Sequence, residues 1–506
     1  MPVVCVDAGT TLVKAVGFGD DGRELAVERQ GVTVDRPSPG WAEQDMAAVS
    51  DAVSTTVRAV VAQLGGTVSF LAITAQGDGC WLVDQDGQPT GPAVLWNDSR
   101  GSAHIRAWLQ AGVLDEAFRI NGSLASAGLP NAILTWFQDE QPQRLRKSAS
   151  SLTCGGWLFS ELTGTVAADE SDAAAPFLDI NTRKYSDRLL ELYDMRWARR
   201  LLPQVLGDDE RVAPLSAGAA QRTGLPSGLP VVLAPYDIAS TALGAGAVAV
   251  GQTCTILGTT LCTEVVTDVP RLDGPAAGLT IPSGAPGRVL RAFPTLAGTG
   301  VLQWTCSLLG LATAAELGEL AARSPVGANG LSLLPYLSPG GERAPFLDPL
   351  ARGSLSGMTL EHTRADVARA VFEGLSLVVQ DCLLASGTAS SELRVSGGGA
   401  ASNFWLQMIA DTTGVPVLRS TDTEVGARGA MLVGAVATGT ADDLEDAAAE
   451  HVRARDVFRP DDATTQRYRR SYEDFLVLRA AQQDTWQSLP GRSAGTGGSA
   501  PVELML

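Results

Sequence analysis

Short apolar runs and polar breaks alternate along the first 64 residues in an order that predicts a β-meander followed by a helix. Residues 3–6 and 12–18 have the pattern of two strands, and a turn signal at 20–22 precedes a third strand at 24–27. Valines then recur at helical spacing, so a helix is expected through about residue 64. Strand and helix signals continue to alternate afterwards, which predicts an α/β fold.

The break between the first two strands has the sequence DAGTT, residues 7–11. A strand follows it, whereas a Walker phosphate loop ends in GK[ST] and opens a helix, and a dinucleotide fingerprint needs three glycines before a helix. Two interpretations remain for these residues alone. One is a tight turn. The other is a hairpin whose amides and threonine hydroxyls face an anion, beside an Asp7 carboxylate that could carry hydrated Mg²⁺.

A second copy of this pattern favours the functional interpretation. Residues 250–264, VGQTCTILGTTLCTE, again give a strand, a Gly-Thr-Thr break and a strand, about 250 residues further along. Two such hairpins predict two related domains that face each other across a cleft. Each domain would offer backbone amides and hydroxyls to phosphate groups from its own side.

Polar clusters also follow later strands of the first half. The strand predicted at 70–74 runs into AQGDG at 75–79, and the strand predicted at 92–96 ends at NDSR, residues 97–100. The second of these clusters has the pattern of a helix start. Open α/β sheets bind ligands beyond the carboxyl ends of their strands, so both clusters are candidates for a substrate site.

Asp237 follows an apolar strand and precedes a helix rich in small residues, within residues 231–251. Aspartate is favoured as a helix N-cap, so a purely structural role is one interpretation. The other is a general base at the mouth of the cleft. The two roles require different orientations of the carboxylate, and both remain open at this stage.

Residues 393–418 contain a strand that ends in three glycines, 397–399, and a helix expected to open at 400–403. Glycines at a helix N-terminus let a flat ligand, such as the base or ribose of a purine nucleotide, lie against the backbone. A tight strand-to-helix turn is the alternative. Gly414 is the residue expected to end this helix.

Composition narrows the class of protein. The chain has 506 residues, enough for at least two domains, and a formal net charge of −18, which argues against a nucleic-acid binder. Seven scattered cysteines without a CxxC pair suggest reduced core thiols, and three distant histidines disfavour a zinc site. We see neither a signal peptide nor a long uncharged apolar run, so a cytoplasmic protein outside the membrane is expected.

The ordered set of motifs resembles the FGGY carbohydrate kinases, a family that includes glycerol kinase and xylulokinase. The match spans about residues 3–440 and rests on these segments: VDAGTT, GWAEQDM, AITAQGDGCWLVD, LWNDSR, ELTG, APYDIASTALGAG, ILGTT, GERAPFLDP, EGLS and SGGGAASNFWLQMIAD. The resemblance implies two actin-like (ribonuclease H-like) domains, with ATP and substrate in the cleft between them. The expected divisions are an N-terminal domain at 1–246, a C-terminal domain at 247–440, a helical extension at 441–488 and a disordered tail at 489–506.

The resemblance also implies roles for individual residues. Asp237 matches the aspartate that takes the proton from the attacking hydroxyl, and Asp7 matches the carboxylate that positions Mg²⁺ through water. The residues expected to contact the ATP phosphates are Gly9, Thr10, Thr11, Lys14, Gly258, Thr259 and Thr260. The residues expected to bind adenosine are Gly398, Gly399, Ala400 and Asn403. The residues expected to contact the sugar or polyol are Gln76, Gly77, Asp78, Trp96, Asp98 and Asp237.

One departure from the family pattern narrows the substrate. Many relatives have a histidine after the glutamine, whereas this chain has Gln76-Gly77-Asp78-Gly79, which is similar to erythritol kinases and secondarily to L-xylulose-type kinases. An ionised Asp78 only accepts hydrogen bonds, which suits a ligand with several hydroxyls. We therefore expect phosphorylation of a terminal hydroxyl of a small linear polyol, erythritol first. A pentulose kinase and a non-catalytic actin-fold regulator are the alternatives, and a homodimer is left open.

Overall fold

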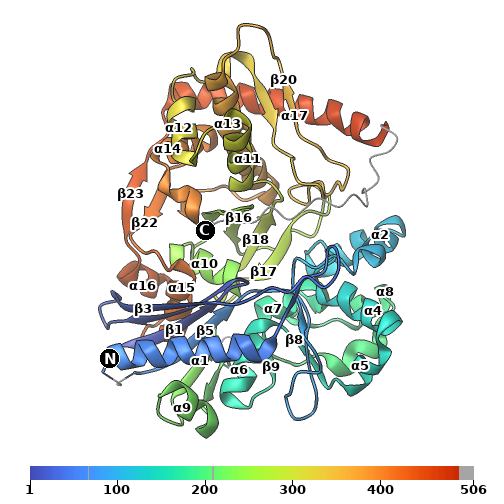
Figure 1. Cartoon of the computed structure of the whole chain (residues 1–506), viewed down its shortest axis with the longest axis vertical. Helices are drawn as coiled ribbons and strands as arrows, with labels where there is room; N and C mark the ends of the chain where they lie inside the picture. Colours follow the sequence, from blue (N-terminus) through green and yellow to red (C-terminus); the bar gives the residue numbers. More distant parts are fainter. Residues whose placement is uncertain (66–67, 208–209, 489–506) are drawn as a thin grey trace.

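Two β-sheets, each covered by helices, divide the molecule into a first and a second lobe. The computed structural model describes residues 1–65, 68–207 and 210–488, and the tail expected at 489–506 lies outside the described residues. The first lobe, blue to teal, lies in the lower half of Figure 1, and the yellow to red second lobe lies above it. Among the described residues, no helix is long and apolar enough to cross a membrane.

The first lobe is built on a mixed six-stranded sheet in which β1 lies between an antiparallel and a parallel neighbour. The strands follow the order β13 (Val212–Pro214), β14 (Pro230–Leu233), β5 (Leu71–Ala75), β1 (Val3–Ala8), β2 (Leu12–Phe18) and β3 (Glu24–Gly31). The meander at the N-terminus is therefore confirmed. β5 is buried at all five residues, as expected for a strand covered on both faces.

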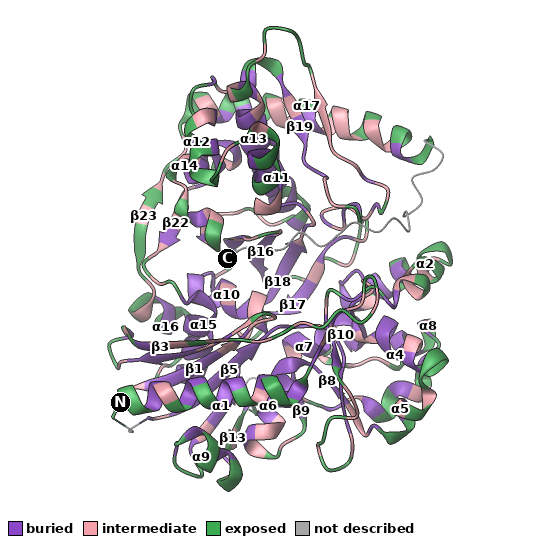
Figure 2. Cartoon of the chain, in the orientation of Figure 1, coloured by how far each residue is buried: buried purple, intermediate pink, exposed green. Residues whose placement is uncertain are grey.

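Helix α1 (Met46–Gln63) covers one face of this sheet, and its burial alternates as the valine spacing predicts. Val49, Val53 and Val57 are buried, and the opposite side of the helix is exposed, which Figure 2 shows as a band of green along α1. Asp45 caps the helix by accepting a hydrogen bond from the Ala47 amide. Amphipathicity thus fixes how the helix sits on the sheet.

The second lobe is built on a seven-stranded sheet that repeats the strand–tip–strand arrangement of the first. Its strands follow the order β17 (Leu279–Pro282), β18 (Val289–Pro294), β16 (Leu261–Thr267), β15 (Gln252–Leu257), β21 (Glu392–Ser396), β22 (Val417–Ser420) and β23 (Ala454–Phe458). β15 pairs antiparallel with β16 and parallel with β21, as β1 does with β2 and β5. The predicted relation between the two hairpins is therefore visible in their topology.

The remaining elements surround the two sheets. The further helices of the first lobe are α2 (Ser102–Gln110), α3 (Val113–Asn121), α4 (Pro130–Glu140), α5 (Pro142–Lys147), α6 (Cys154–Thr163), α7 (Glu170–Phe177), α8 (Asp187–Leu192), the 3₁₀ turn η1 (Arg196–Leu201) and α9 (Ala217–Thr223). The helices of the second lobe are α11 (Thr299–Leu309), α12 (Ala314–Ala321), η2 (Ala328–Gly330), α13 (Arg364–Ser386), η3 (Gly398–Ala401), α14 (Asn403–Thr413) and α17 (Asp462–Ser488). Short strand pairs are β4 (Glu43–Gln44) with β7 (Ala93–Val94), β6 (Trp81–Val83) with β8 (Ser150–Leu152), β9 (Ala167–Asp169) with β12 (Gln204–Leu206), β10 (Leu178–Asp179) with β11 (Lys184–Tyr185), and β19 (Ser332–Leu334) with β20 (Ser354–Ser356).

Three helices join the lobes between the two sheets. α10 (Asp237–Ala245) contributes to a core with β15 and β16, whereas α15 (Val425–Ala437) and α16 (Leu444–His451) pack with β1, β2 and β5 of the first lobe. Figure 1 shows all three at the level where the lobes meet. After α16, the chain returns to the second sheet as β23. The C-terminal part of the chain therefore supports both lobes.

Local differences from the sequence-based expectations have simple causes. The NDSR segment forms a turn, and α2 begins only at Ser102. The glycines at 397–399 lead into the 3₁₀ turn η3, so α14 begins at Asn403 with Ser402 as its N-cap. Gly414 ends α14 in the left-handed conformation, as predicted. The extension expected to be helical at 441–488 includes strand β23, which pairs antiparallel with β22 at the edge of the second sheet.

Candidate active site

A cavity of about 520 Å³ lies between the two lobes and contains residues from both predicted phosphate loops. It brings together eight of the predicted site residues, namely Asp7, Gly9, Thr10, Gly77, Asp78, Trp96, Asp237 and Thr260. Their positions in the sequence span 253 residues (260 − 7). Polar groups that converge in one cavity from distant segments are typical of a catalytic site.

The first hairpin tip is held by a polar network around Thr10. Its hydroxyl donates to Gln76 Oε1 at 3.0 Å and accepts from Trp96 Nε1 at 2.9 Å. The Gln44 amide donates to the Thr10 carbonyl oxygen at 2.9 Å and accepts from Gln76 Nε2 at 2.8 Å. Buried Gln76 thus orients the tip and is not itself part of the cavity lining. This network links the predicted phosphate loop to the predicted substrate side.

The second hairpin tip, residues 258–260, packs against the start of α11. The Thr299 amide donates to the Gly258 carbonyl at 2.8 Å, and the Gly300 amide donates to the Thr259 carbonyl at 3.1 Å. Thr260 is the residue of this tip that lines the cavity. A side chain at Gly298 would place its Cβ 2.6 Å from backbone atoms of the tip, so the close approach requires glycine there.

Asp237 is the first residue of α10 and not its N-cap, which is Tyr236. One carboxylate oxygen accepts from the Ile238 amide at 2.8 Å, and a second hydrogen bond comes from the Gly77 amide. Burial, followed by the negative charge of Asp7, raises the pKa of Asp237 from its usual 3.8 to about 7. A carboxylate that exchanges protons near neutral pH in a ligand cavity has the property of a general base.

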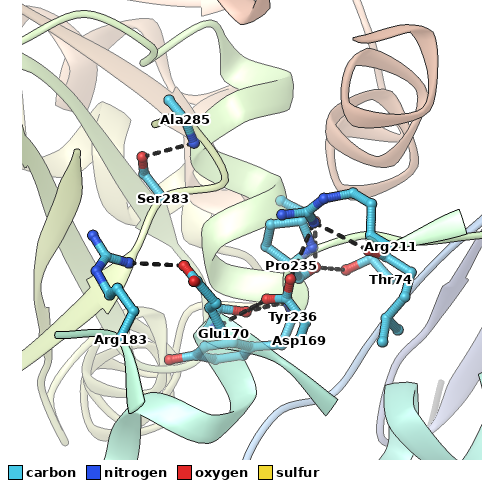
Figure 3. A network of polar contacts seen from close by, with 12 residues as sticks. Thr74, Asp169, Glu170, Arg183, Arg211, Pro235, Tyr236, Ser283 and Ala285 are labelled. Atoms are coloured by element: carbon cyan, nitrogen blue, oxygen red, sulfur yellow. Dashed lines mark hydrogen bonds and ion pairs between the residues drawn. The ribbon is translucent and has the colours of Figure 1, made fainter. Parts of the chain in front are cut away.

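The backbone before Asp237 is fixed by a buried network from other elements of the first lobe (Figure 3). The Tyr236 amide donates to the Ser171 hydroxyl at 3.0 Å, and the Thr74 hydroxyl donates to the Pro235 carbonyl at 2.7 Å. Ser171 in turn donates to Asp169, whose other oxygen accepts from Arg211 at 3.0 Å. The hydrogen bonds to Pro235 and Tyr236 thus come from residues of the first lobe, and they hold the backbone that presents Asp237 to the cavity.

Asp78 occupies the left-handed region with φ = 55°, which an aspartate tolerates better than most residues do. Its neighbour Gly77 leaves room for Tyr236, since a Cβ there would lie 2.1 Å from the Tyr236 ring. Burial raises the pKa of Asp78 to about 6, and the charge of Arg343 acts in the opposite direction. At pH 7.5 the carboxylate is mostly ionised and can accept hydrogen bonds.

Asp98 does not reach the cavity. Its side chain is fully buried, and its oxygens accept from the Ala42 amide at 2.7 Å and from the Arg100 guanidinium at 2.9 Å. Two polar residues of the NDSR segment, Asp98 and Arg100, thus form an ion pair just before α2. No residue of the NDSR segment lines the cavity, whereas Trp96, which directly precedes it, does.

The predicted adenosine turn lies outside this cavity but next to the second hairpin. A Cβ at Gly397 would lie 2.8 Å from the carbonyl oxygen of Leu257, the last residue of β15. Gly398 has no atom within 4 Å of its missing Cβ, so its surface is open. Asn403 is held by Arg419, which donates to its Oδ1 at 2.8 Å. The turn could therefore extend a nucleotide site from the 258–260 tip.

Lys14 and Thr11 also lie outside the cavity lining. The Lys14 ammonium lies 3.4 Å from Asp7 Oδ2, and burial raises the pKa of Asp7 while this ion pair opposes the rise. Among the described residues, no three His, Cys, Asp or Glu side chains form a metal-binding group. Two cavity carboxylates, Asp7 and Asp237, are hard oxygen donors, which fits an Mg²⁺ ion that keeps waters and takes phosphate oxygens.

Arg343 is a functional candidate that we did not single out from the sequence. It lines the cavity from the second lobe, and its Nε donates to the Pro294 carbonyl at 2.8 Å. The preceding Glu342 accepts from the Leu296 amide at 2.7 Å and fixes the loop. Arg343 lies within the GERAP segment, but its approach to Asp78 depends on residues 265 positions apart (343 − 78), which no local pattern shows.

The comparisons identify the class of protein. Residues 2–244 match the N-terminal domain of the FGGY family of carbohydrate kinases, and residues 254–438 match its C-terminal domain. The chain therefore belongs to the FGGY family of carbohydrate kinases, which are phosphotransferases. The expected fold of two actin-like domains around a cleft is confirmed.

Individual relatives agree on the class and differ in substrate. The chain is 32% identical to an erythritol kinase of Brucella abortus (strain 2308), over 96% of this chain and 97% of the relative. It is 29% identical to an L-xylulose/3-keto-L-gulonate kinase of Escherichia coli (strain K12), over 94% and 96%. A crystal structure of xylulose kinase from Rhodospirillum rubrum superposes with a TM-score of 0.88 at 28% identity, over 96% of this chain and all of that one.

Proposed function

We propose that this sugar or polyol kinase transfers the γ-phosphoryl group of ATP to a terminal hydroxyl of a small linear polyol, with erythritol as the first candidate. The observation that carries the proposal is the pair of acidic residues, Asp78 and Asp237, in a cavity that also contains a residue from each GTT tip. The erythritol kinase of Brucella abortus, 32% identical over 96% of the chain, supports the choice of substrate.

In the proposed reaction, Asp237 holds the attacking hydroxyl and accepts its proton. The hydroxyl oxygen forms a bond to the γ-phosphorus, the bond from that phosphorus to the β–γ bridging oxygen breaks, and ADP leaves with the electron pair. A primary alcohol is a poor nucleophile until its proton has an acceptor, and a pKa near 7 makes Asp237 an effective one at neutral pH.

The two GTT tips hold the phosphates from opposite sides. Thr260 offers its hydroxyl group, and Thr10, Thr11, Gly258 and Thr259 offer backbone amides. The Thr10 hydroxyl and the Gly9 amide shape the first tip, because they donate to Gln76 and to the Leu12 carbonyl. Mg²⁺, held through water by Asp7, supplies charge neutralisation for the phosphate oxygens when it is bound. The turn that is open at Gly398, with Gly399, Ala400 and Asn403, accepts the adenosine.

The polyol lies between an acceptor of the first lobe and a donor of the second. Asp78 accepts hydrogen bonds from substrate hydroxyls, and the Arg343 guanidinium donates to substrate oxygens. Arg343 is the one cationic side chain that lines the cavity in the described part of the chain. Because a substrate bound to both residues bridges the lobes, its binding favours the closed cleft that excludes water from the phosphoryl transfer.

A pentulose is the second candidate substrate. The relative named L-xylulose/3-keto-L-gulonate kinase is 29% identical over 94% of the chain, and the carbonyl oxygen of a ketose could accept from Arg343. A non-catalytic regulator is the third interpretation, and it would require Asp237 to have no role in phosphoryl transfer.

A substrate panel tests the proposal. ATP consumption is measured with erythritol, glycerol, xylitol, D-xylulose, L-xylulose and ribulose, at saturating Mg²⁺. We expect the highest kcat/KM with erythritol. Activity confined to a ketopentose would overturn the erythritol assignment and leave the kinase chemistry intact, and binding without turnover for every compound would favour the regulator.

A further inference from the structure

Three charged residues form a row across the first three strands. Lys14 of β2 is the direct cross-strand partner of Asp7 on β1 and of Arg29 on β3. Side chains of directly opposite residues lie on the same face of a sheet. The negative charge of Asp7 is therefore followed on that face by the positive charges of Lys14 and Arg29. Two cations side by side repel each other unless another carboxylate separates them.

Glu424 supplies that carboxylate from a distant part of the chain. One oxygen lies 3.2 Å from the Lys14 ammonium, and the other accepts from the Arg29 guanidinium. Glu424 is the N-cap residue of α15, yet its side chain makes no capping hydrogen bond. Only 6% of its side chain is exposed, whereas 46% of the Arg29 side chain is exposed. The carboxylate is therefore directed to the row and not to its own helix.

Lys14 is thus shared between two carboxylates, 3.4 Å from Asp7 Oδ2 and 3.2 Å from Glu424 Oε2. Asp7 lines the cavity, and within the described chain no side-chain hydrogen bond engages its other oxygen. α15 approaches the same carboxylate, because a Cβ at Gly426 would lie 2.9 Å from Asp7 Oδ2. Segment 424–426 therefore borders Asp7 on the side of Oδ2, the oxygen that Lys14 contacts.

We propose that Glu424 is a positioning residue that holds Lys14 between two carboxylates, so that Asp7 remains able to bind Mg²⁺ with its nucleotide. The proposal rests on the proposed function, in which Asp7 holds the ion. Without Glu424, Asp7 would be the one carboxylate left in contact with Lys14 in the described part of the chain, and the ammonium would pair with it fully. Mg²⁺ would then have to compete with an ammonium for the same oxygens.

The test measures how Mg²⁺ affects nucleotide binding in Glu424→Gln. The affinity of ADP is determined by calorimetry over a series of Mg²⁺ concentrations, and ATP turnover is measured in parallel. We expect the half-saturating Mg²⁺ concentration to rise by about tenfold, the range typical of residues that support a metal ligand. We expect the KM for the polyol to stay within about twofold, since Glu424 is not part of the cavity lining.

Two variants separate positioning from a general structural role. Glu424→Asp keeps a carboxylate and should restore most of the Mg²⁺ response. Glu24→Gln is the matched control, because Glu24 accepts from the Glu424 amide and the Thr423 hydroxyl, at 3.4 Å each, without a contact to Lys14. An unchanged Mg²⁺ response in Glu424→Gln, or an equal shift in Glu24→Gln, would overturn the proposal.

Arg29→Gln provides an independent test of the proposal if Glu424→Gln does not fold. Removal of the half-exposed guanidinium leaves Glu424 to pair with Lys14 alone, which draws the ammonium away from Asp7. The Mg²⁺ requirement should then fall, opposite in sign to Glu424→Gln, and a rise would contradict the proposal. If the wild-type chain phosphorylates no polyol, the proposed function fails; if it does and these shifts are absent, only the positioning role fails.

Discussion

At the scale of the residue, the site depends on two buried carboxylates with different surroundings. Asp237 has amide donors and the charge of Asp7 nearby, and its pKa is raised to about 7. Asp78 faces the cation Arg343, and its pKa is raised only to about 6. Carboxylates whose environments separate their pKa values take different chemical roles, here a proton acceptor and an acceptor of substrate hydrogen bonds.

Asp237→Asn should remove the proton acceptor while it preserves the shape of the side chain. We expect kcat to fall by about 10²- to 10⁴-fold, the usual contribution of a general base. The KM values for polyol and ATP should change little, because an amide oxygen can still accept a hydrogen bond. Steady-state kinetics check this, and an unchanged kcat would mean that Asp237 is not the base.

The pH dependence of activity follows from the same raised pKa. Asp237 must be ionised to accept a proton, so kcat/KM should rise with pH up to about 7 and then level off. Rate profiles from pH 5 to 9 with erythritol provide the measurement. A rate that is already maximal at pH 5 would show that the essential acceptor has an ordinary carboxylate pKa.

Stability should respond to pH in the opposite sense. Because burial raises the pKa of Asp237, the folded state binds a proton more tightly than the unfolded chain, so this group makes stability fall as pH rises from about 4 to about 7. The ligand-free Asp237→Asn variant lacks that ionisation. Its Tm should exceed that of the wild type at pH 8, and the difference should shrink towards pH 5.

At the scale of the element, the segment joining β14 to α10 is held by groups from outside its own strand and helix. The Tyr236 amide depends on Ser171, which lies at the start of α7. Asp169, at the end of β9, accepts from Ser171, and Arg211, which precedes β13, donates to Asp169. This support explains why Asp237 can be buried and still aimed at the cavity.

Ser171→Ala should leave the Tyr236 amide without its acceptor. A buried unsatisfied donor costs about 1–3 kcal/mol, so the free energy of unfolding should fall by that amount, and kcat should fall because Asp237 is less well held. Denaturant unfolding and kinetics measure both effects. Ser283→Ala is a suitable control, because this nearby buried serine accepts from Ala285 in a separate turn. If Ser171→Ala and Ser283→Ala lowered kcat equally, the contact of Ser171 with the Tyr236 amide would have no specific role in catalysis.

The elements themselves could largely be predicted from the sequence, because their signals are local. The valines of α1 and the two GTT hairpins lie within single stretches of the chain, and the structure has them where they were expected. Asp98 accepts from Arg100, two residues on, and from the Ala42 amide, 56 residues back. Glu424 pairs with Arg29, 395 residues away, and Arg343 acts on the distant Asp78. Such pairings follow from three-dimensional packing and have no periodic signal.

At the scale of the whole molecule, the lobes are joined by a crossing of α10 and α15 at glycines. A Cβ at Gly244 would lie 1.9 Å from the Val425 carbonyl oxygen, and one at Gly429 would lie 1.8 Å from the Ser240 carbonyl oxygen. The two helix backbones are therefore in contact. α10 begins with the proposed base and α15 begins beside Asp7, so this crossing holds the starts of both helices at the active site.

Gly244→Ala tests whether the close contact between α10 and α15 is needed for the stability and activity of the protein. Replacing a helical glycine with alanine normally stabilises a protein by about 0.5–1 kcal/mol, because the unfolded chain loses freedom. Here the methyl group would meet backbone that cannot move without separating the helices, so Tm and kcat should both fall. Gly218→Ala in α9 is the control, because its Cβ would meet only the end of the Arg222 side chain at 3.8 Å and should leave Tm equal or higher. If Gly244→Ala behaved like Gly218→Ala, the crossing would tolerate a wider spacing, and the close contact of α10 with α15 would not be what aligns Asp237 with Asp7.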